Sequence, residues 1–327
     1  MNSDPPIRLI PHYSQHTDYG DSKLHMLFLS DQVRVEAYAQ ALRETVRPGD
    51  VVLDIGTGPA VLAMLAARAG ARRVYAIEGE PRVIPMTQQI IDQAGLGSVI
   101  TLLPGISQEI TLPEPVDVIV SELIGGLGND EGMVPTLEDA RDRFLRPETG
   151  RMVPQRVDTY IAPVSAPEAH AQTATVYDHD LVVPPEGARE RFRAYYSFLG
   201  GVPPDRLLAA GQLVDHVDHF GTTETSFART RVFEIVKPGV FSGFVAWFVA
   251  CLSDHVVLDV SPGNPGTCWG QAYLPMPDQV SVQGGDGVEL IFEATLDAGE
   301  PVPHYIWTSC ITREGRKIAA GRAGHLR

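Results

Sequence analysis

The chain has 327 residues, 44% of them hydrophobic and 20% charged, so it is long enough for two domains that each bury a core. It contains no apolar run of about 18 residues that would predict a membrane span, no signal-peptide pattern at its N-terminus, and only three cysteines, whose spacing predicts neither disulfides nor a metal site. We expect a cytoplasmic protein, and the net charge of −15 argues against nucleic acid as a partner.

The first half of the chain alternates between helix and strand patterns. Apolar residues have helical spacing over residues 31–42. Short apolar runs typical of buried strands then alternate with helical segments; the strands cover 51–55, 74–77, 100–103 and 116–120, and the helices 59–69, 81–94 and 135–145. Because strands that alternate with helices pair in parallel, we expect residues 1–150 to form an N-terminal helical segment and a doubly wound, Rossmann-like α/β domain.

The second half of the chain has the pattern of an all-β domain. Its strand-like runs are separated by turns rich in Gly, Pro and Asp, and they cover 156–161, 232–235, 241–252, 256–260, 269–274, 288–294 and 306–311. The sequence therefore predicts a barrel or sandwich over residues 151–327, interrupted by a less regular insertion at about 165–215.

A glycine turn follows the first strand of the α/β domain. Gly56 and Gly58 let the chain turn tightly and let a ligand approach the backbone. Glu78 ends the next strand, where a carboxylate accepts hydrogen bonds from ribose hydroxyls. The dinucleotide fingerprint requires glycine where this chain has Val61, and Pro59 removes an N–H that a pyrophosphate would use. The turn favours S-adenosylmethionine (SAM) over NAD, and a turn without a ligand is the third alternative.

Two glutamates flank the loop that follows the strand at 116–120. Glu122 comes at the end of that strand, and Glu131 follows nine residues later, across the glycine-rich segment 123–130. If the loop folds back, the two carboxylates face one another and need a cation between them. A guanidinium offers paired N–H donors to each carboxylate. The alternative from these residues alone is that Glu122 caps a helix and Glu131 is solvated.

In this order, the motifs resemble those of the protein arginine methyltransferase family, in which the two glutamates form the double-E loop. The match runs from about Tyr19 to Met276, and it is weakest over 165–230, where the family carries its dimerisation arm; the resemblance thus implies a homodimer. The residues that carry it are the run Asp54 to Gly58, Glu78, Ser121, Glu122, Glu131, Tyr19, His25, Phe28, Leu29, Asp31, Arg34, the runs Ala140 to Pro147 and Tyr160 to Pro163, Ser261, Pro262, and Thr267 to Trp269.

The resemblance implies a role for each matched residue. Glu122 and Glu131 would be catalytic, and the acceptor would contact Tyr19, Phe28 and Trp269. The cofactor SAM would be bound by His25, Arg34 on its carboxylate, Asp54, Gly56, Gly58, Glu78 on the ribose, Gln108 on the adenine amino group, and Met133 facing the sulfonium.

Three features depart from the family pattern. Cys268 stands where the family usually has histidine, so a His–Asp pair with Asp31 is expected to be missing. Phe28 stands where members that make the asymmetric dimethyl product have methionine, which favours a monomethyl product. The double-E loop is unusually rich in glycine and lacks the family's aromatic residues, which argues against a rigid loop and a close fit to a peptide.

These departures favour a small acceptor. The composition, rich in Ala, Gly, Pro and Val with only three lysines, is typical of a GC-rich bacterial genome. The chain resembles bacterial relatives that methylate free arginine in natural-product metabolism, so we expect a SAM-dependent methyltransferase acting on the guanidino ω-nitrogen of free L-arginine. Peptidyl arginine is the alternative acceptor, and a catalytically inactive SAM-binding module is the third possibility.

Overall fold

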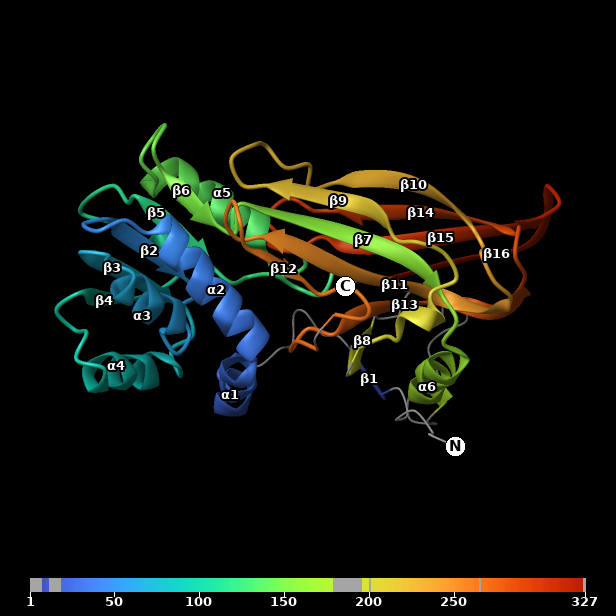
Figure 1. The fold of residues 1–327 in the computed structure, drawn as a ribbon, viewed down its shortest axis with the longest axis horizontal. Helices are drawn as coiled ribbons and strands as arrows, with labels where there is room; N and C mark the ends of the chain where they lie inside the picture. Colours follow the sequence, from blue (N-terminus) through green and yellow to red (C-terminus); the bar gives the residue numbers. More distant parts are fainter. Residues whose placement is uncertain (1–7, 12–18, 179–195, 200, 265, 326–327) are drawn as a thin grey trace.

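The computed structural model describes residues 8–11, 19–178, 196–199, 201–264 and 266–325. A small parallel sheet with its helices lies at one end of the molecule, and long antiparallel strands extend from it to the other end (Figure 1). Among the residues described, no helix has the length and apolar character needed to span a membrane.

The parallel sheet confirms the predicted α/β domain. Its strands have the order β4-β3-β2-β5-β6, and they are β2 (Val51–Ile55), β3 (Arg73–Glu78), β4 (Ile100–Pro104), β5 (Val118–Ser121) and β6 (Arg151–Val153). Successive side chains of a strand point to opposite faces, and every residue of β2 is buried, so both faces of the sheet are covered. The sheet extends past the expected boundary at residue 150, because β6 pairs with β5.

Helices bury their apolar residues against this sheet. The predicted ones are α2 (Gln32–Thr45), α3 (Val61–Arg68), α4 (Ile84–Gln93) and α5 (Met133–Phe144), and they share one core with the strands. An additional helix, α1 (Ser22–Ser30), was not predicted. Asp31 separates α1 from α2 and caps the N-terminus of α2, since its Oδ1 accepts the backbone N–H of Arg34 at 2.9 Å.

The β domain consists of two antiparallel sheets. One sheet has the order β1-β8-β13-β11-β7-β9, with β12 paired to β11, and its strands are β1 (Arg8–Pro11), β7 (Arg156–Val164), β8 (Tyr196–Leu199), β9 (Gln212–Asp218), β11 (Gly239–Cys251), β12 (Val257–Asp259) and β13 (Gln271–Val282). The other has the order β10-β14-β15-β16, with β10 (Phe227–Glu234), β14 (Gly287–Thr295), β15 (His304–Arg313) and β16 (Arg316–His325). Residues of both sheets share an apolar core that includes Phe244, Phe292 and Trp307, which confirms the predicted all-β architecture.

Part of the expected insertion at 165–215 lies outside the described residues, namely 179–195 and 200. The rest contains α6 (Pro167–Asp178), β8, the short 3₁₀ helix η2 (Pro204–Arg206) and the start of β9. The chain between β7 and β9 thus adds a helix and the strand β8, which lies between β1 and β13 in the larger sheet.

Candidate active site

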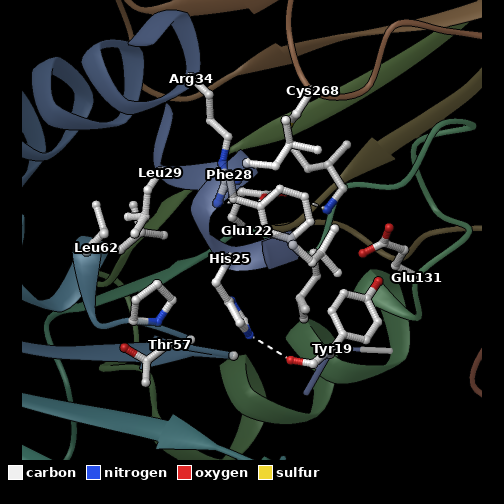
Figure 2. Close-up of a pocket in the computed structure, with 18 of the residues that line it drawn as sticks. Tyr19, His25, Phe28, Leu29, Arg34, Thr57, Leu62, Glu122, Glu131 and Cys268 are labelled. Atoms are coloured by element: carbon white, nitrogen blue, oxygen red, sulfur yellow. Dashed lines mark hydrogen bonds and ion pairs between the residues drawn. The ribbon is translucent and has the colours of Figure 1, made fainter. Parts of the chain in front are cut away.

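A cavity of about 510 Å³ lies at the carboxyl ends of β2, β3 and β5, the edge at which open α/β sheets bind ligands. Helices α1 and α2, the glycine turn, the double-E loop and the barrel loop with Cys268 all contribute to its wall (Figure 2). The structure brings most of the predicted site residues together there: Tyr19, His25, Phe28, Arg34, Gly56, Gly58, Glu78, Glu122, Glu131 and Trp269.

Three predicted cofactor residues do not line this cavity. Asp54 is fully buried at the end of β2, where its Oδ2 accepts the Thr57 hydroxyl at 2.6 Å, so it holds the turn rather than a ligand. Gln108 is exposed in the 3₁₀ helix η1 (Ser107–Glu109), and its amide oxygen accepts the Ser107 hydroxyl at 3.2 Å. Met133 begins α5 and is fully buried.

The glycine turn has the backbone that its sequence requires. Gly56 and Gly58 have φ of +71° and +50°, in the left-handed region that favours glycine. Both glycines line the cavity, so no side chain stands between their backbone and a ligand. The two residues thus provide a cradle against which a ligand can lie close to the backbone.

Glu78 lies beside this turn and is buried. Its Oε2 accepts the backbone N–H of Gly58 at 2.8 Å, and its Oε1 accepts that of Glu80 at 2.7 Å. Each carboxylate oxygen can accept a second hydrogen bond, so Glu78 is oriented and still able to accept the hydroxyls of a ribose. This donor set fits the nucleoside of SAM.

Arg34 and Glu122 form an ion pair inside the cavity, with Nη2 of Arg34 3.0 Å from Oε2 of Glu122. Nη1 of Arg34 is buried and has no hydrogen-bond partner in the described part of the chain. A buried guanidinium N–H without a partner is costly, and an anionic ligand would satisfy it. Arg34 therefore fits the predicted role of holding the SAM carboxylate.

Glu122 is neither exposed nor a helix cap. Its Oε1 accepts the backbone N–H of Ile124 at 3.2 Å, and burial raises the pKa of its carboxyl while Arg34 opposes that rise. Glu131 accepts a hydrogen bond from the Tyr19 hydroxyl, and Figure 2 shows these two side chains on the same side of the cavity. Glu122 therefore does not cap a helix, and Glu131, which is partly exposed, has the Tyr19 hydroxyl as a partner.

His25 holds the segment that carries Tyr19. Its Nε2 lies 2.6 Å from the Tyr19 carbonyl oxygen and donates to it, while the edge of the ring with Nδ1 and Cε1 lies beside Gly58. His25 therefore connects the glycine turn to the residue that contacts Glu131.

Hydrogen bonds fasten the double-E loop, contrary to the expectation of a loosely held segment. Oδ1 of Asp130 accepts the N–H of Leu127 at 2.9 Å, and the Thr159 hydroxyl donates to the Leu127 carbonyl at 3.1 Å. A Cβ on Gly128 would lie 2.6 Å from that hydroxyl oxygen. The glycine content thus permits close packing of the loop against β7.

Asp31 is also paired, although the histidine expected opposite it is absent. Its Oδ2 accepts the backbone N–H of Cys268 at 2.8 Å. Burial raises the pKa of the Cys268 thiol, so the thiol keeps its proton and does not act as a base. Asp31 therefore still links α2 to the barrel loop, through the backbone N–H of Cys268. The identity of the side chain at position 268 did not indicate this contact.

Tyr38 is a residue of the site region that the sequence identified only as an apolar position of a helix. It is fully buried, and its hydroxyl donates to the carbonyl of Ser121, next to Glu122, at 3.1 Å. A tyrosine at an apolar helix position could have indicated such a contact, because a buried tyrosine hydroxyl needs a hydrogen-bond partner. Tyr38 ties α2 to the end of β5.

Comparisons with known proteins agree with this geometry. The family model of ribosomal protein L11 methyltransferase (PrmA) matches residues 36–127, which contain the glycine turn, Glu78 and Glu122. A protein arginine N-methyltransferase of Arabidopsis thaliana, PRMT10, is 28% identical over 297 residues, 80% of this chain and 77% of the relative. An arginine N(omega)-methyltransferase of Streptomyces achromogenes subsp. streptozoticus is 29% identical over 276 residues, 81% of this chain and 74% of the relative.

A solved structure shows the same fold. The Trypanosoma brucei PRMT1 enzyme-prozyme complex with AdoHcy superposes with a TM-score of 0.79 at 22% identity, covering 94% of this chain and 99% of that one. Its combination of a parallel α/β sheet and antiparallel sheets is the architecture described above. The chain is a SAM-dependent methyltransferase whose sequence is similar to those of arginine methyltransferases and whose fold is similar to that of a solved member of that family.

Proposed function

We propose that the protein transfers a methyl group from SAM to a guanidino ω-nitrogen of free L-arginine. The observation that carries this proposal is that Glu122 and Glu131 line the same cavity as the glycine turn and Glu78. That arrangement suits two ligands that meet end to end, a nucleoside at the turn and a guanidinium at the glutamates.

The roles of the side chains follow from their environments. SAM, when bound, supplies an activated methyl group on its sulfonium. Glu122 and Glu131 bind the guanidinium and draw its positive charge toward the N–H groups they hold, so that the remaining ω-nitrogen gains lone-pair character. Both carboxylates are in place before the acceptor enters, since Ile124 orients Glu122 and Tyr19 orients Glu131. The proton released afterwards goes to Glu131 or to a water, because the Cys268 thiol holds its own proton.

Free L-arginine is proposed as the acceptor because the Streptomyces relative named arginine N(omega)-methyltransferase matches 81% of this chain. Peptidyl arginine is the second candidate, since the Arabidopsis relative of similar identity is named a protein arginine N-methyltransferase.

Two further expectations stay predictions: a cytoplasmic homodimer that pairs through residues 165–215, and a role in antibiotic biosynthesis. Light scattering after gel filtration tests the dimer.

The acceptor is tested by incubating the protein with SAM and either free L-arginine or an Arg-Gly-rich peptide. Mass spectrometry then reads which molecule gains a methyl group. We expect monomethyl-L-arginine as the main product. Methylation of the peptide alone would overturn the choice of acceptor, and the absence of product on both would mean an inactive SAM-binding module.

A further inference from the structure

The guanidinium of Arg34 occupies contacts that an acceptor guanidinium requires. Besides its ion pair with Glu122, its central carbon lies 4.9 Å from the centre of the Phe28 ring and 5.7 Å from that of the Trp269 ring. Phe28 and Trp269 are the rings proposed to contact the acceptor. The Arg34 side chain therefore makes contacts with Glu122, Phe28 and Trp269 that the guanidinium of an acceptor would also make.

The same guanidinium is the group best placed to hold the carboxylate of SAM. Among the described residues that line the cavity, Arg34 is the only lysine or arginine. Nη2 is engaged by Glu122, whereas Nη1 is buried and has no hydrogen-bond partner in that part of the chain. The Arg34 guanidinium thus pairs with Glu122 through Nη2 and can pair with a ligand carboxylate through Nη1.

A carboxylate at Nη1 changes the electrostatics of Glu122. Like charges repel strongly in a partly buried site. Without a ligand carboxylate to share its charge, Arg34 therefore opposes the entry of a second guanidinium. When a ligand carboxylate takes up part of the charge of Arg34, that repulsion falls and Glu122 again requires a cation. The direction of the effect is the same whether Arg34 turns away from Glu122 or bridges the two carboxylates.

We propose that Arg34 makes binding of the acceptor conditional on the carboxylate of the cofactor. The inference rests on the proposed function and concerns the same site. The backbone of Arg34 is held, because Asp31 accepts its N–H at 2.9 Å and the N–H of Cys268 at 2.8 Å, so only the Arg34 side chain has to rearrange. By thermodynamic linkage, the acceptor strengthens binding of the cofactor by the same factor.

Calorimetry on the full chain tests this coupling without turnover. L-arginine, and separately an Arg-Gly-rich peptide, is titrated into the protein alone, into the protein saturated with S-adenosylhomocysteine, and into the protein saturated with S-adenosyl-3-thiopropylamine. The last two ligands lack the sulfonium charge and differ only in the carboxylate. We expect S-adenosylhomocysteine to increase acceptor affinity about 10-fold or more, and the decarboxylated analogue to leave it near that of the protein alone.

A charge-free variant gives an independent measurement. In Arg34→Met the acceptor should bind the protein alone about as tightly as it binds the wild type saturated with S-adenosylhomocysteine, and that ligand should no longer change the affinity. Arg68→Met, at an exposed position of α3, is the matched control and should keep the coupling. Circular dichroism checks that both variants fold, and if Arg34→Met does not, the two ligands on the wild type still decide the question.

Two outcomes would overturn the inference in different ways. Equal acceptor affinity with the two analogues would refute the coupling and leave the proposed function standing. If neither acceptor binds even with S-adenosylhomocysteine present, the proposed function fails, and the coupling fails with it.

Discussion

The indole Nε1 of Trp269 donates a hydrogen bond to the carbonyl oxygen of Ile124 at 2.6 Å. This contact joins the barrel domain to the double-E loop two residues after Glu122. Ile124 in turn donates its N–H to Oε1 of Glu122 at 3.2 Å. The position of the Glu122 carboxylate therefore depends on Trp269 of the other domain, which lies 145 positions after Ile124 in the sequence.

Trp269→Phe should lower kcat by about 10-fold and leave cofactor affinity unchanged, because the ring stays against Phe248 while the donor is lost. The buried Ile124 carbonyl loses its partner, which should cost about 1–3 kcal/mol of unfolding free energy. Urea unfolding and steady-state kinetics measure both effects. Trp307→Phe is the control: it removes the donor to the Pro275 carbonyl in the barrel core and should lower stability alone. If the two variants have the same kcat, Trp269 does not position Glu122.

Glu122→Gln should reduce kcat by about 100-fold or more, since the amide cannot stabilise the positive charge that develops on the guanidinium. The amide still fits the space and can still accept from Ile124. Glu36→Gln, on the exposed face of α2, should have the activity of the wild type. Wild-type turnover by Glu122→Gln would refute the electrostatic role.

Phe28→Met should shift the product from monomethyl toward dimethyl arginine, because a flexible side chain leaves more space beside the acceptor nitrogen. Phe28 lines the cavity and packs over Arg34, so the size of its side chain affects the space at the proposed acceptor site. Mass spectrometry of the product after long incubation gives the ratio of the two forms. Phe220→Met, at an exposed position after β9, is the control. An unchanged ratio would assign product choice to other residues.

Stability should fall as the pH rises from about 4 to about 7, owing in part to Asp54. Burial raises the pKa of the Asp54 carboxyl from 3.8 to about 7, so the folded chain binds this proton more tightly than the unfolded chain does. The difference between the two pKa values corresponds to roughly 4 kcal/mol as an upper estimate. Asp215, whose pKa burial raises to about 6, acts in the same direction.

Asp54→Asn isolates the contribution of Asp54, because the amide keeps an acceptor for the Thr57 hydroxyl and does not ionise. Its unfolding free energy, measured in urea at several pH values, should fall less between pH values of about 4 and about 7 than that of the wild type. Parallel curves for the two proteins would show that Asp54 does not titrate in this window.

Elements with strong local patterns were predictable, and those without were not. The strands β2, β3, β4 and β5 are apolar runs bounded by turns, and the structure confirms all four. β16 was missed because its sequence, RKIAAGRAGH, has no apolar alternation, and its pairing with β15 keeps it in the sheet. α1 was missed because its apolar residues follow one another without a polar face, and Met26 and Leu27 remain exposed.

The sequence by itself determined the glycine turn and its acidic partner. Gly56 and Gly58 adopt φ values that favour glycine, and the order of parallel strands places Glu78 and Glu122 at one edge of the sheet. Only the tertiary structure decided that Arg34 pairs with Glu122 and that Cys268 reaches Asp31 through its backbone N–H, 237 positions away. Local propensity and spacing describe neighbours along the chain, whereas these contacts depend on how two domains pack, which a single sequence does not encode in any short pattern.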